Sequence, residues 1–285
     1  MVSGPISVGP VGEKGERALA AVATPGACRH HPLAGLPWQR ADPVIHRRKQ
    51  ATPPPLVNAA LKPLLSAVLL ATGLILPSVP TQAAAAWTTL FDGHSTAAWR
   101  GYRLSGFPAD CWIVEDGLLK TVPGHEHDLI TRDQYRDFEL ELEWRVAVGA
   151  NSGIMYHVTE QGPETYSTGP EMQIVDDDHS DDGKDPLTSA GALYDLVAPT
   201  HKKLHPAGQW NRARLVVRGR HVEHWLNGVR IVAYELGSPE LQARIAQTKF
   251  KDWPGFAQAE TGYLALQNHG GQVCFRRIRV RRLDH

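Results

Sequence analysis

The sequence has little cysteine, little methionine and no apolar run long enough to cross a membrane. Its longest apolar stretch, residues 64–77, is shorter than the roughly 20 residues that a membrane-spanning helix needs. The only methionines are Met1, Met155 and Met172, so a start of translation near Val57 would need an alternative codon such as GTG.

The N-terminal part of the chain contains almost no aromatic side chains. Residues 1–56 are rich in Pro, Gly, Ala and Arg and show no period of two or 3.6. Such a segment buries too little apolar surface to offset the entropy lost on ordering. We therefore expect it to be a disordered extension, or to precede the true start of the protein.

Residues 57–86 have the three parts of a secretory signal peptide. Lys62 supplies the positive charge, residues 64–77 form the apolar centre, and residues 81–86 (TQAAAA) are small. The alternative is a membrane anchor, for which the apolar run is short. We expect cleavage between Ala84 and Trp87, and export of residues 87–285 to the periplasm or outside a bacterial cell, with no stable membrane span left after cleavage.

The exported part lacks the basic charge of a nucleic-acid binder. Removing residues 1–86 leaves 22 basic against 27 acidic side chains. Nucleic-acid binding depends on neutralising phosphates with a basic surface. The basic run 275–282 (FRRIRVRR) alternates with apolar residues, as a half-exposed strand does. We therefore expect no nucleic-acid partner.

Two cysteines remain after removal of the leader with Cys28. Cys111 and Cys274 can pair in an oxidising compartment, and two buried free thiols are the alternative. The sequence leaves this open.

From Trp87 onward, turn signals recur every 8 to 12 residues, and the segments between them alternate or are β-branched and aromatic. This pattern predicts an all-β sandwich. In residues 138–146 (FELELEWRV) apolar and charged residues alternate, which gives one core face and one polar face. The one expected helix is residues 238–250, with Ser238 as N-cap. The other main strands are predicted at 87–93, 111–122, 151–158, 171–175, 211–219, 221–228, 229–236, 262–270 and 272–282.

Several of these segments together are similar to a known family. They are WTTLFDG, FELELEWR, NSGIMYH, PEMQIVDD, GALY, GQWNRARLVVRG and GYLALQNHGGQVCFRRIRV, in this order over residues 87–283. The set resembles the 3-keto-disaccharide hydrolase domain family, within the concanavalin A-like lectin and glucanase superfamily. The resemblance implies a jelly-roll sandwich of two curved antiparallel sheets, and an exported enzyme that cleaves 3-keto-glycosides.

A ketone at C3 changes the chemistry that a glycosidase needs. The ketone acidifies the hydrogen on C2, so a base can remove it and the enolate can expel the group at C1. Such a site needs a general base, a donor or metal ion for the enolate oxygen, and an acid for the leaving group. A retaining glycosidase instead needs two carboxylates about 5 Å apart.

The segment 171–177 (EMQIVDD) is the most informative for catalysis. A period of two places Glu171 and Gln173 on one face and the apolar residues between them on the core face. Glucanases of this fold often carry a second acid where Gln173 stands, so a two-carboxylate glucanase is disfavoured. Glu171 is a candidate base or metal ligand, and Asp176 is expected to point into the site. A solvated glutamate without a function is the alternative for Glu171.

Further candidates come from neighbouring strands. His269 ends a strand beside two glycines and is either catalytic or an exposed loop histidine. The expected sugar-binding residues are Gln173, Gln267, Glu143, Arg145, Tyr156, His157 and Tyr194. Tyr156 or His157 has to face outward by alternation. Tyr194 either contacts sugar or belongs to the core.

The metal requirement stays open, although a divalent ion is compatible with the sequence. Residues 178–183 (DHSDDG) faintly resemble a calcium loop, but position twelve is Ser189 instead of Glu. His125 and His127 have a spacing that can hold one ion, without an evident third ligand. The alternative functions are a non-catalytic carbohydrate-binding module and a conventional glucanase.

Overall fold

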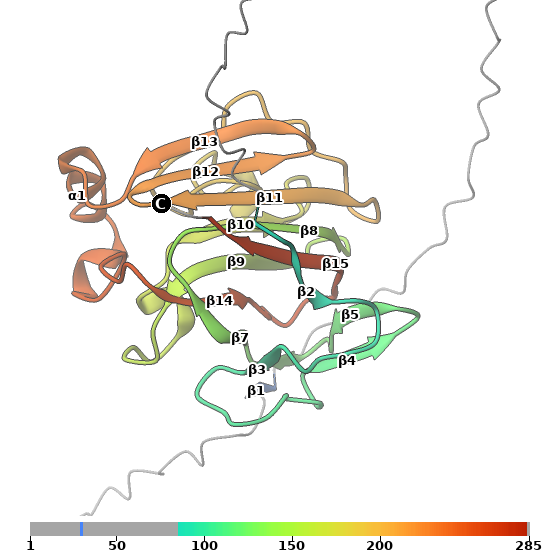
Figure 1. Ribbon diagram of the computed structural model, residues 1–285. Coiled ribbons are helices and arrows are strands. Elements are labelled where there is room, and N and C mark those ends of the chain that lie inside the picture. The colour runs from blue at the N-terminus through green and yellow to red at the C-terminus, as the bar shows by residue number, and fades with distance from the viewer. Residues whose placement is uncertain (1–28, 31–84, 284–285) are drawn as a thin grey trace, which may run out of the picture.

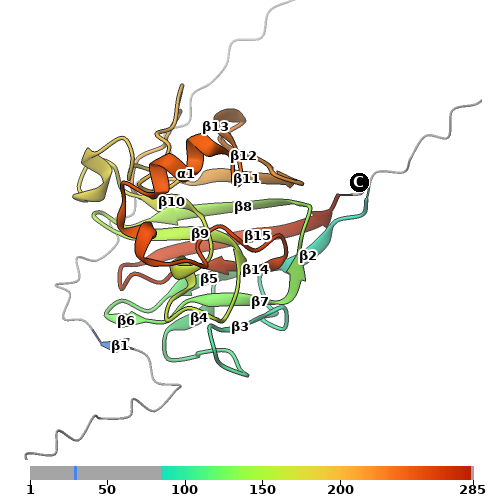
Figure 2. The same cartoon turned by 90° about the vertical axis from the view of Figure 1, so that its left-hand side faces the viewer.

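The computed structural model describes residues 29–30 and 85–283. Residues 85–283 form a sandwich of two antiparallel sheets with one α-helix at the side (Figure 1). Figure 2 shows the two sheets stacked as layers. The all-β jelly-roll prediction is confirmed. No helix in the described part of the chain is long and apolar enough to cross a membrane.

The smaller sheet has five strands in the order β10, β9, β14, β7 and β3. Their bounds are Glu171–Val175 for β10, Asn151–Val158 for β9, Gly262–Leu266 for β14, Leu129–Tyr135 for β7 and Trp99–Gly101 for β3. All neighbouring strands in this sheet are antiparallel.

The larger sheet has the order β13, β12, β11, β8, β15, β5 and β4, and β2 also pairs with β15. The bounds are Val229–Glu235 for β13, His221–Leu226 for β12, Asn211–Arg218 for β11, Phe138–Val146 for β8, Val273–Arg282 for β15, Leu118–Thr121 for β5, Trp112–Glu115 for β4 and Thr88–Phe91 for β2.

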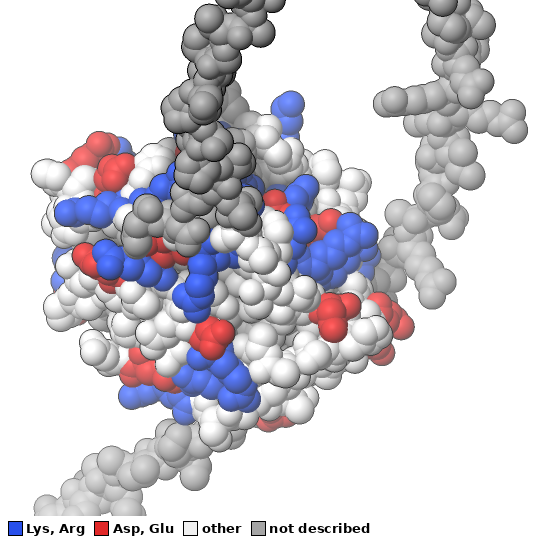
Figure 3. Space-filling model, in the orientation of Figure 1, with Lys and Arg blue, Asp and Glu red and all other residues white. Residues whose placement is uncertain are grey.

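The core lies between the two sheets, and the sequence pattern of β8 explains which of its side chains enter the core. Phe138, Leu140, Leu142 and Trp144 are buried in it, as the alternation predicts. The intervening glutamates face outward. Glu139 and Glu141 each form ion pairs with arginines of both flanking strands, β11 and β15, and Glu143 pairs with arginines of β15 alone. Figure 3 shows basic side chains spread over this outer face.

The predicted helix 238–250 divides into two short elements. Helix α1 covers Pro239–Ile245, and the Ser238 hydroxyl accepts a hydrogen bond from the Leu241 N–H. A second cap at Thr248 accepts from the Phe250 N–H and begins the 3₁₀ helix η3, Lys249–Asp252. The second cap ends the helical pattern early and begins the short element that carries Lys249.

The strand β1, Arg29–His30, pairs with β6, His125–Glu126. The predicted signal peptide and most of the N-terminal extension lie outside the described residues. Cys274 is a buried free thiol, so the possible pairing of Cys111 with Cys274 does not form.

Candidate active site

The five-stranded sheet carries an acidic and an amide side chain on the face turned away from the core. In β10, Met172 and Ile174 point into the core, and Glu171 and Gln173 alternate with them. Glu171 is 6% exposed and Gln173 is 1% exposed. The strand pattern therefore places two polar side chains together under the loops that cover this sheet.

A glycine in the neighbouring strand gives Glu171 its position. A Cβ atom at Gly153 of β9 would lie 1.8 Å from Glu171 Oε1 and 2.6 Å from its Cδ. The carboxyl group therefore lies against the backbone of β9, in space that every other residue type would fill.

Several buried polar atoms at this place have no hydrogen-bond partner among the described residues. They are Glu171 Oε1, both amide atoms of Gln173, and Asn151 Oδ1. Burying a polar group without a partner costs free energy, so such groups are rare in folded proteins. Their concentration on adjacent strands is typical of a site that binds a polar ligand.

The electrostatic surroundings make Glu171 a strong base when it is ionised. Burial and, next, the negative charge of Asp128 raise the pKa of Glu171 to about 8, although the positive charge of Lys249 lowers it. Asp182 also raises the pKa of Glu171, as a smaller cause. A carboxyl group with this pKa is suited to proton transfer near neutral pH.

Asp182 belongs to a second group of side chains beside Glu171. The 3₁₀ helix η2, Asp182–Lys184, holds it so that its carboxylate accepts from Asn151 Nδ2 at 2.6 Å and from the Tyr194 hydroxyl at 3.3 Å. Lys249 Nζ lies 4.6 Å from the centre of the Tyr194 ring. Burial and the carboxylates of Asp182 and Glu171 raise the pKa of Tyr194, which keeps its hydroxyl protonated.

Asp128, which directly precedes β7, is the remaining charged residue beside Lys249 and Asp182 that affects the pKa of Glu171. Its Oδ2 accepts from the Thr165 hydroxyl, and its Oδ1 accepts from the Asn268 N–H at 2.9 Å. Burial raises the pKa of Asp128 to about 6, even though these two hydrogen bonds act to lower it. At pH 7 Asp128 is therefore mainly ionised and Glu171 mainly protonated.

Three other predicted residues lie around this face. The Gln267 N–H donates to the Gly153 carbonyl oxygen at 3.0 Å, which places Gln267 at the end of β14 beside Glu171. His269 is exposed, and its charge lowers the pKa of Asp128. Tyr194 contacts Asp182, as described above.

Four predicted sugar-binding residues do not reach Glu171. Glu143 and Arg145 belong to β8 in the other sheet, where Glu143 pairs with arginines of β15. Tyr156 is a fully buried core residue that packs edge-on against Phe138.

His157 is buried as well, and its Nε2 lies 2.8 Å from the Arg136 carbonyl oxygen. The backbone of His157 has a φ of 52°, in the left-handed region, which breaks the alternation that predicted an outward side chain. Neither Tyr156 nor His157 therefore faces the site.

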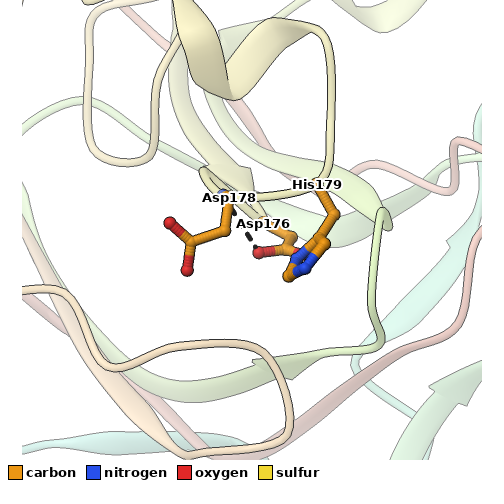
Figure 4. Close-up of side chains that lie close together, drawn as sticks. All are labelled: Asp176, Asp178 and His179. Atoms are coloured by element: carbon orange, nitrogen blue, oxygen red, sulfur yellow. Dashed lines mark hydrogen bonds and ion pairs between the residues drawn. The ribbon is translucent and has the colours of Figure 1, made fainter.

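Asp176, which was expected to point into the site, lies in a turn with Asp178 and His179 (Figure 4). Its carboxylate accepts from the Gly149 N–H at 2.8 Å and the Asp178 N–H at 3.2 Å, and lies 2.9 Å from His179 Nδ1. Asp176, Asp178 and His179 each offer an atom within 4.8 Å of the others. Because both Asp176 oxygens already serve the turn, these contacts explain the cluster without an ion.

The outer face of the eight-stranded sheet has a hollow of about 800 Å³, lined by Glu141, Glu143, Arg212, Arg276, Arg277 and Arg279, among others. Its two glutamates are ion-paired with these arginines. None of the described residues that line it has a buried polar atom without a partner. The unpartnered atoms therefore place the candidate active site at Glu171, on the other sheet.

Sequence reasoning missed Asp128, Asp182 and Lys249 as site residues. Asp128 and Asp182 lie in segments that the sequence singled out only as weak metal patterns, and Lys249 lies in the predicted helix. A local pattern does not show that these three segments converge on one strand.

The sequence is similar to known proteins over nearly all of the sandwich. Residues 86–281 match the model of the family described as the 3-keto-alpha-glucoside-1,2-lyase-like domain. A protein of Bacteroides thetaiotaomicron named 3-keto-disaccharide hydrolase is 32% identical over 229 residues, covering 70% of this chain and 79% of the relative.

Solved structures from Parabacteroides distasonis share the fold. One, described as a candidate glycosyl hydrolase, is 31% identical with a TM-score of 0.64, covering 70% of this chain and 94% of that one. A second is 24% identical with a TM-score of 0.55, covering 70% and 100%, and supports the fold alone. The family match spans nearly all of the sandwich, and this chain belongs to the family of 3-keto-α-glucoside-1,2-lyase-like domains.

Proposed function

We propose that this protein cleaves glycosides in which a glucose unit carries a ketone at C3, and that Glu171 begins the reaction by removing the proton at C2. The observation that carries the proposal is the buried, unpartnered Glu171 Oε1 beside the unpartnered amide of Gln173. The family description and the name of the Bacteroides relative support the substrate class.

The proposed reaction needs no oxidant or reductant. The carboxylate takes the proton from C2, and the electrons of that C–H bond move toward C3 to form an enolate. When they return, a double bond forms between C1 and C2 and the C1–O bond breaks. The leaving oxygen takes up a proton, so the products are an unsaturated 3-keto sugar and an alcohol. Addition of water to the unsaturated sugar completes a net hydrolysis.

The side chains around Glu171 fit the remaining needs of this reaction. The Gln173 amide can donate to the ketone oxygen, on which negative charge develops. His269, exposed beside Asp128, can deliver the proton to the leaving oxygen. Tyr194 and Gln267, which lie around the same face, can contact the sugar. Gln173 stands where a conventional glucanase of this fold would need an acid, which disfavours direct displacement at C1.

Substrate choice separates this proposal from its alternatives. We expect the protein to turn over a 3-keto-glucoside and not its unoxidised parent, as measured by release of the alcohol. Turnover of both substrates would indicate a conventional glucanase. Binding of either sugar by calorimetry without turnover would indicate a carbohydrate-binding module.

Isotopic labelling tests the first step. With deuterium at C2, we expect turnover to slow, or the label to exchange into solvent, because elimination breaks that bond. The measurement is mass spectrometry of the sugar product together with the initial rate. Full retention of deuterium through complete turnover would exclude elimination and favour displacement at C1.

We also propose that the protein acts outside the cytoplasm after removal of a signal peptide. The support is the sequence of residues 57–86, with a basic start, an apolar centre and small residues before Trp87. N-terminal sequencing of the exported protein should find a start between Ala84 and Trp87. A mature chain that begins before Val57 would contradict the proposal.

A further inference from the structure

Asp128 is a charged group of the site that, unlike Glu171, has hydrogen-bond partners for its carboxylate. Both of its oxygens are occupied, one by the Thr165 hydroxyl and one by the Asn268 N–H. The two donors are 37 and 140 residues away in the sequence, so three separate segments meet at this carboxylate. Two donors on a carboxylate favour its ionised form.

The contacts of Asp128 lead directly to Glu171. Asn268, which donates to Asp128, follows Gln267, and the Gln267 N–H donates to the carbonyl oxygen of Gly153, against which the Glu171 carboxyl group lies. Among the charged groups that face Glu171, Asp128 has the largest influence, ahead of Lys249 and Asp182. Asp128 in turn faces Glu164, whose charge raises its pKa, and His269, whose charge lowers it. Tyr194 also faces Glu171, but it is neutral over the relevant pH range.

We propose that Asp128 is a positioning residue that acts through Glu171: its clamped negative charge keeps Glu171 a strong base for proton removal. This inference rests on the proposed function, in which Glu171 is the base that removes the proton at C2. The interaction between the two carboxyl groups of Asp128 and Glu171 can be measured in the protein without a substrate.

The basicity of Glu171 matters because proton removal next to a ketone gains from a base whose pKa is near the working pH. An isolated glutamate is a much weaker base. Removing the Asp128 charge should make Glu171 ionise at lower pH and also make it less effective once ionised. A purely structural function of Asp128 would reduce activity without moving the ionisation of Glu171.

The experiment is a ¹³C NMR titration of the exported chain labelled at the glutamate side-chain carboxyl carbons, with Glu171→Gln used to assign the signal. In the wild type we expect a main midpoint near pH 8, and a second, smaller inflection near pH 6 from Asp128. Asp128→Asn and Asp128→Ser should lower the main midpoint by about one pH unit and remove the inflection.

Three further variants control the test. Thr165→Val should move the inflection to higher pH because it removes a donor to Asp128, whereas Thr165→Ser keeps the hydroxyl and should not. Lys249→Met should raise the main midpoint, opposite to the Asp128 variants, since it removes a cation.

The proposal is overturned if the Asp128 variants leave the Glu171 midpoint in place, or if the wild-type Glu171 signal has no inflection from Asp128. The second criterion uses the unmodified protein, so it holds even if no Asp128 variant folds. Because no substrate is present, the outcome is independent of whether the protein cleaves 3-keto-glycosides. The pH profile of kcat/KM then tests the link to activity: its acidic limb should shift with the NMR midpoint.

Discussion

Replacing Glu171 by Gln is expected to lower the turnover of a 3-keto-glucoside by about 100-fold or more, as for the loss of a general base. Binding should change much less, because Gln has nearly the same shape. The measurements are kcat from initial rates and the Kd of an unreactive parent sugar. Glu143→Gln is the matched control: it makes the same change in the other sheet and should leave turnover nearly unchanged.

Although Glu171→Gln should lower turnover, it should raise the stability of the fold at alkaline pH. Burial raises the pKa of Glu171 from its ordinary value of about 4.5 to about 8, so the folded protein binds a proton more tightly than the unfolded chain does. This contribution favours unfolding as pH rises from about 4.5 to 8, with a cost on the order of 5 kcal/mol above that range. Glu171→Gln removes the cost.

Urea unfolding at pH 5 and pH 9 should therefore show little change at the lower pH and a more stable variant at the higher pH. Lower activity together with higher alkaline stability is typical of a group held in an unfavourable environment for its function. Unchanged turnover in Glu171→Gln would contradict the assigned function of Glu171. Unchanged alkaline stability would contradict its raised pKa.

The sequence predicted those parts of the fold and the site that depend on local periodicity. Alternation in 138–146 correctly separates core residues from outward glutamates, and in 171–175 it places Glu171 and Gln173 on one face. Alternation required either Tyr156 or His157 to face outward. Tyr156 points into the core, and alternation then failed at His157, because its left-handed backbone interrupts the strand and its side chain is buried.

The other residues of the site depend on contacts between distant segments. Thr165 and Asn268 reach Asp128 only after the chain has folded, and Lys249 approaches because Thr248 ends one helical segment and starts another. The same limit explains Glu143 and Arg145: they do lie on a polar strand face, but the sequence cannot show that this face belongs to the opposite sheet.

The position of Glu171 can be tested without changing any functional group. Gly153→Ala adds one methyl group where Glu171 Oε1 and Cδ now lie, at 1.8 and 2.6 Å from the added carbon. Gly153 does not have a left-handed backbone, so alanine fits its φ, and the three atoms nearest to the added methyl group all belong to the Glu171 side chain. A displacement of about 1 Å is enough to cost about 100-fold in rate. We expect at least this loss in kcat.

Gly106→Ala is the matched control, because a Cβ atom there meets nothing within 4 Å, and it should leave kcat and stability nearly unchanged. Overpacking at Gly153 should destabilise the fold by about 1–3 kcal/mol, measurable by urea unfolding. The decisive comparison is the double variant with Glu171→Gln. If Gly153→Ala acts only by displacing the Glu171 carboxylate, it should add little further loss in that background, because the group it displaces is already inactive. If the two substitutions instead lower kcat independently, so that their fold-losses multiply in the double variant, Gly153 affects turnover by another route.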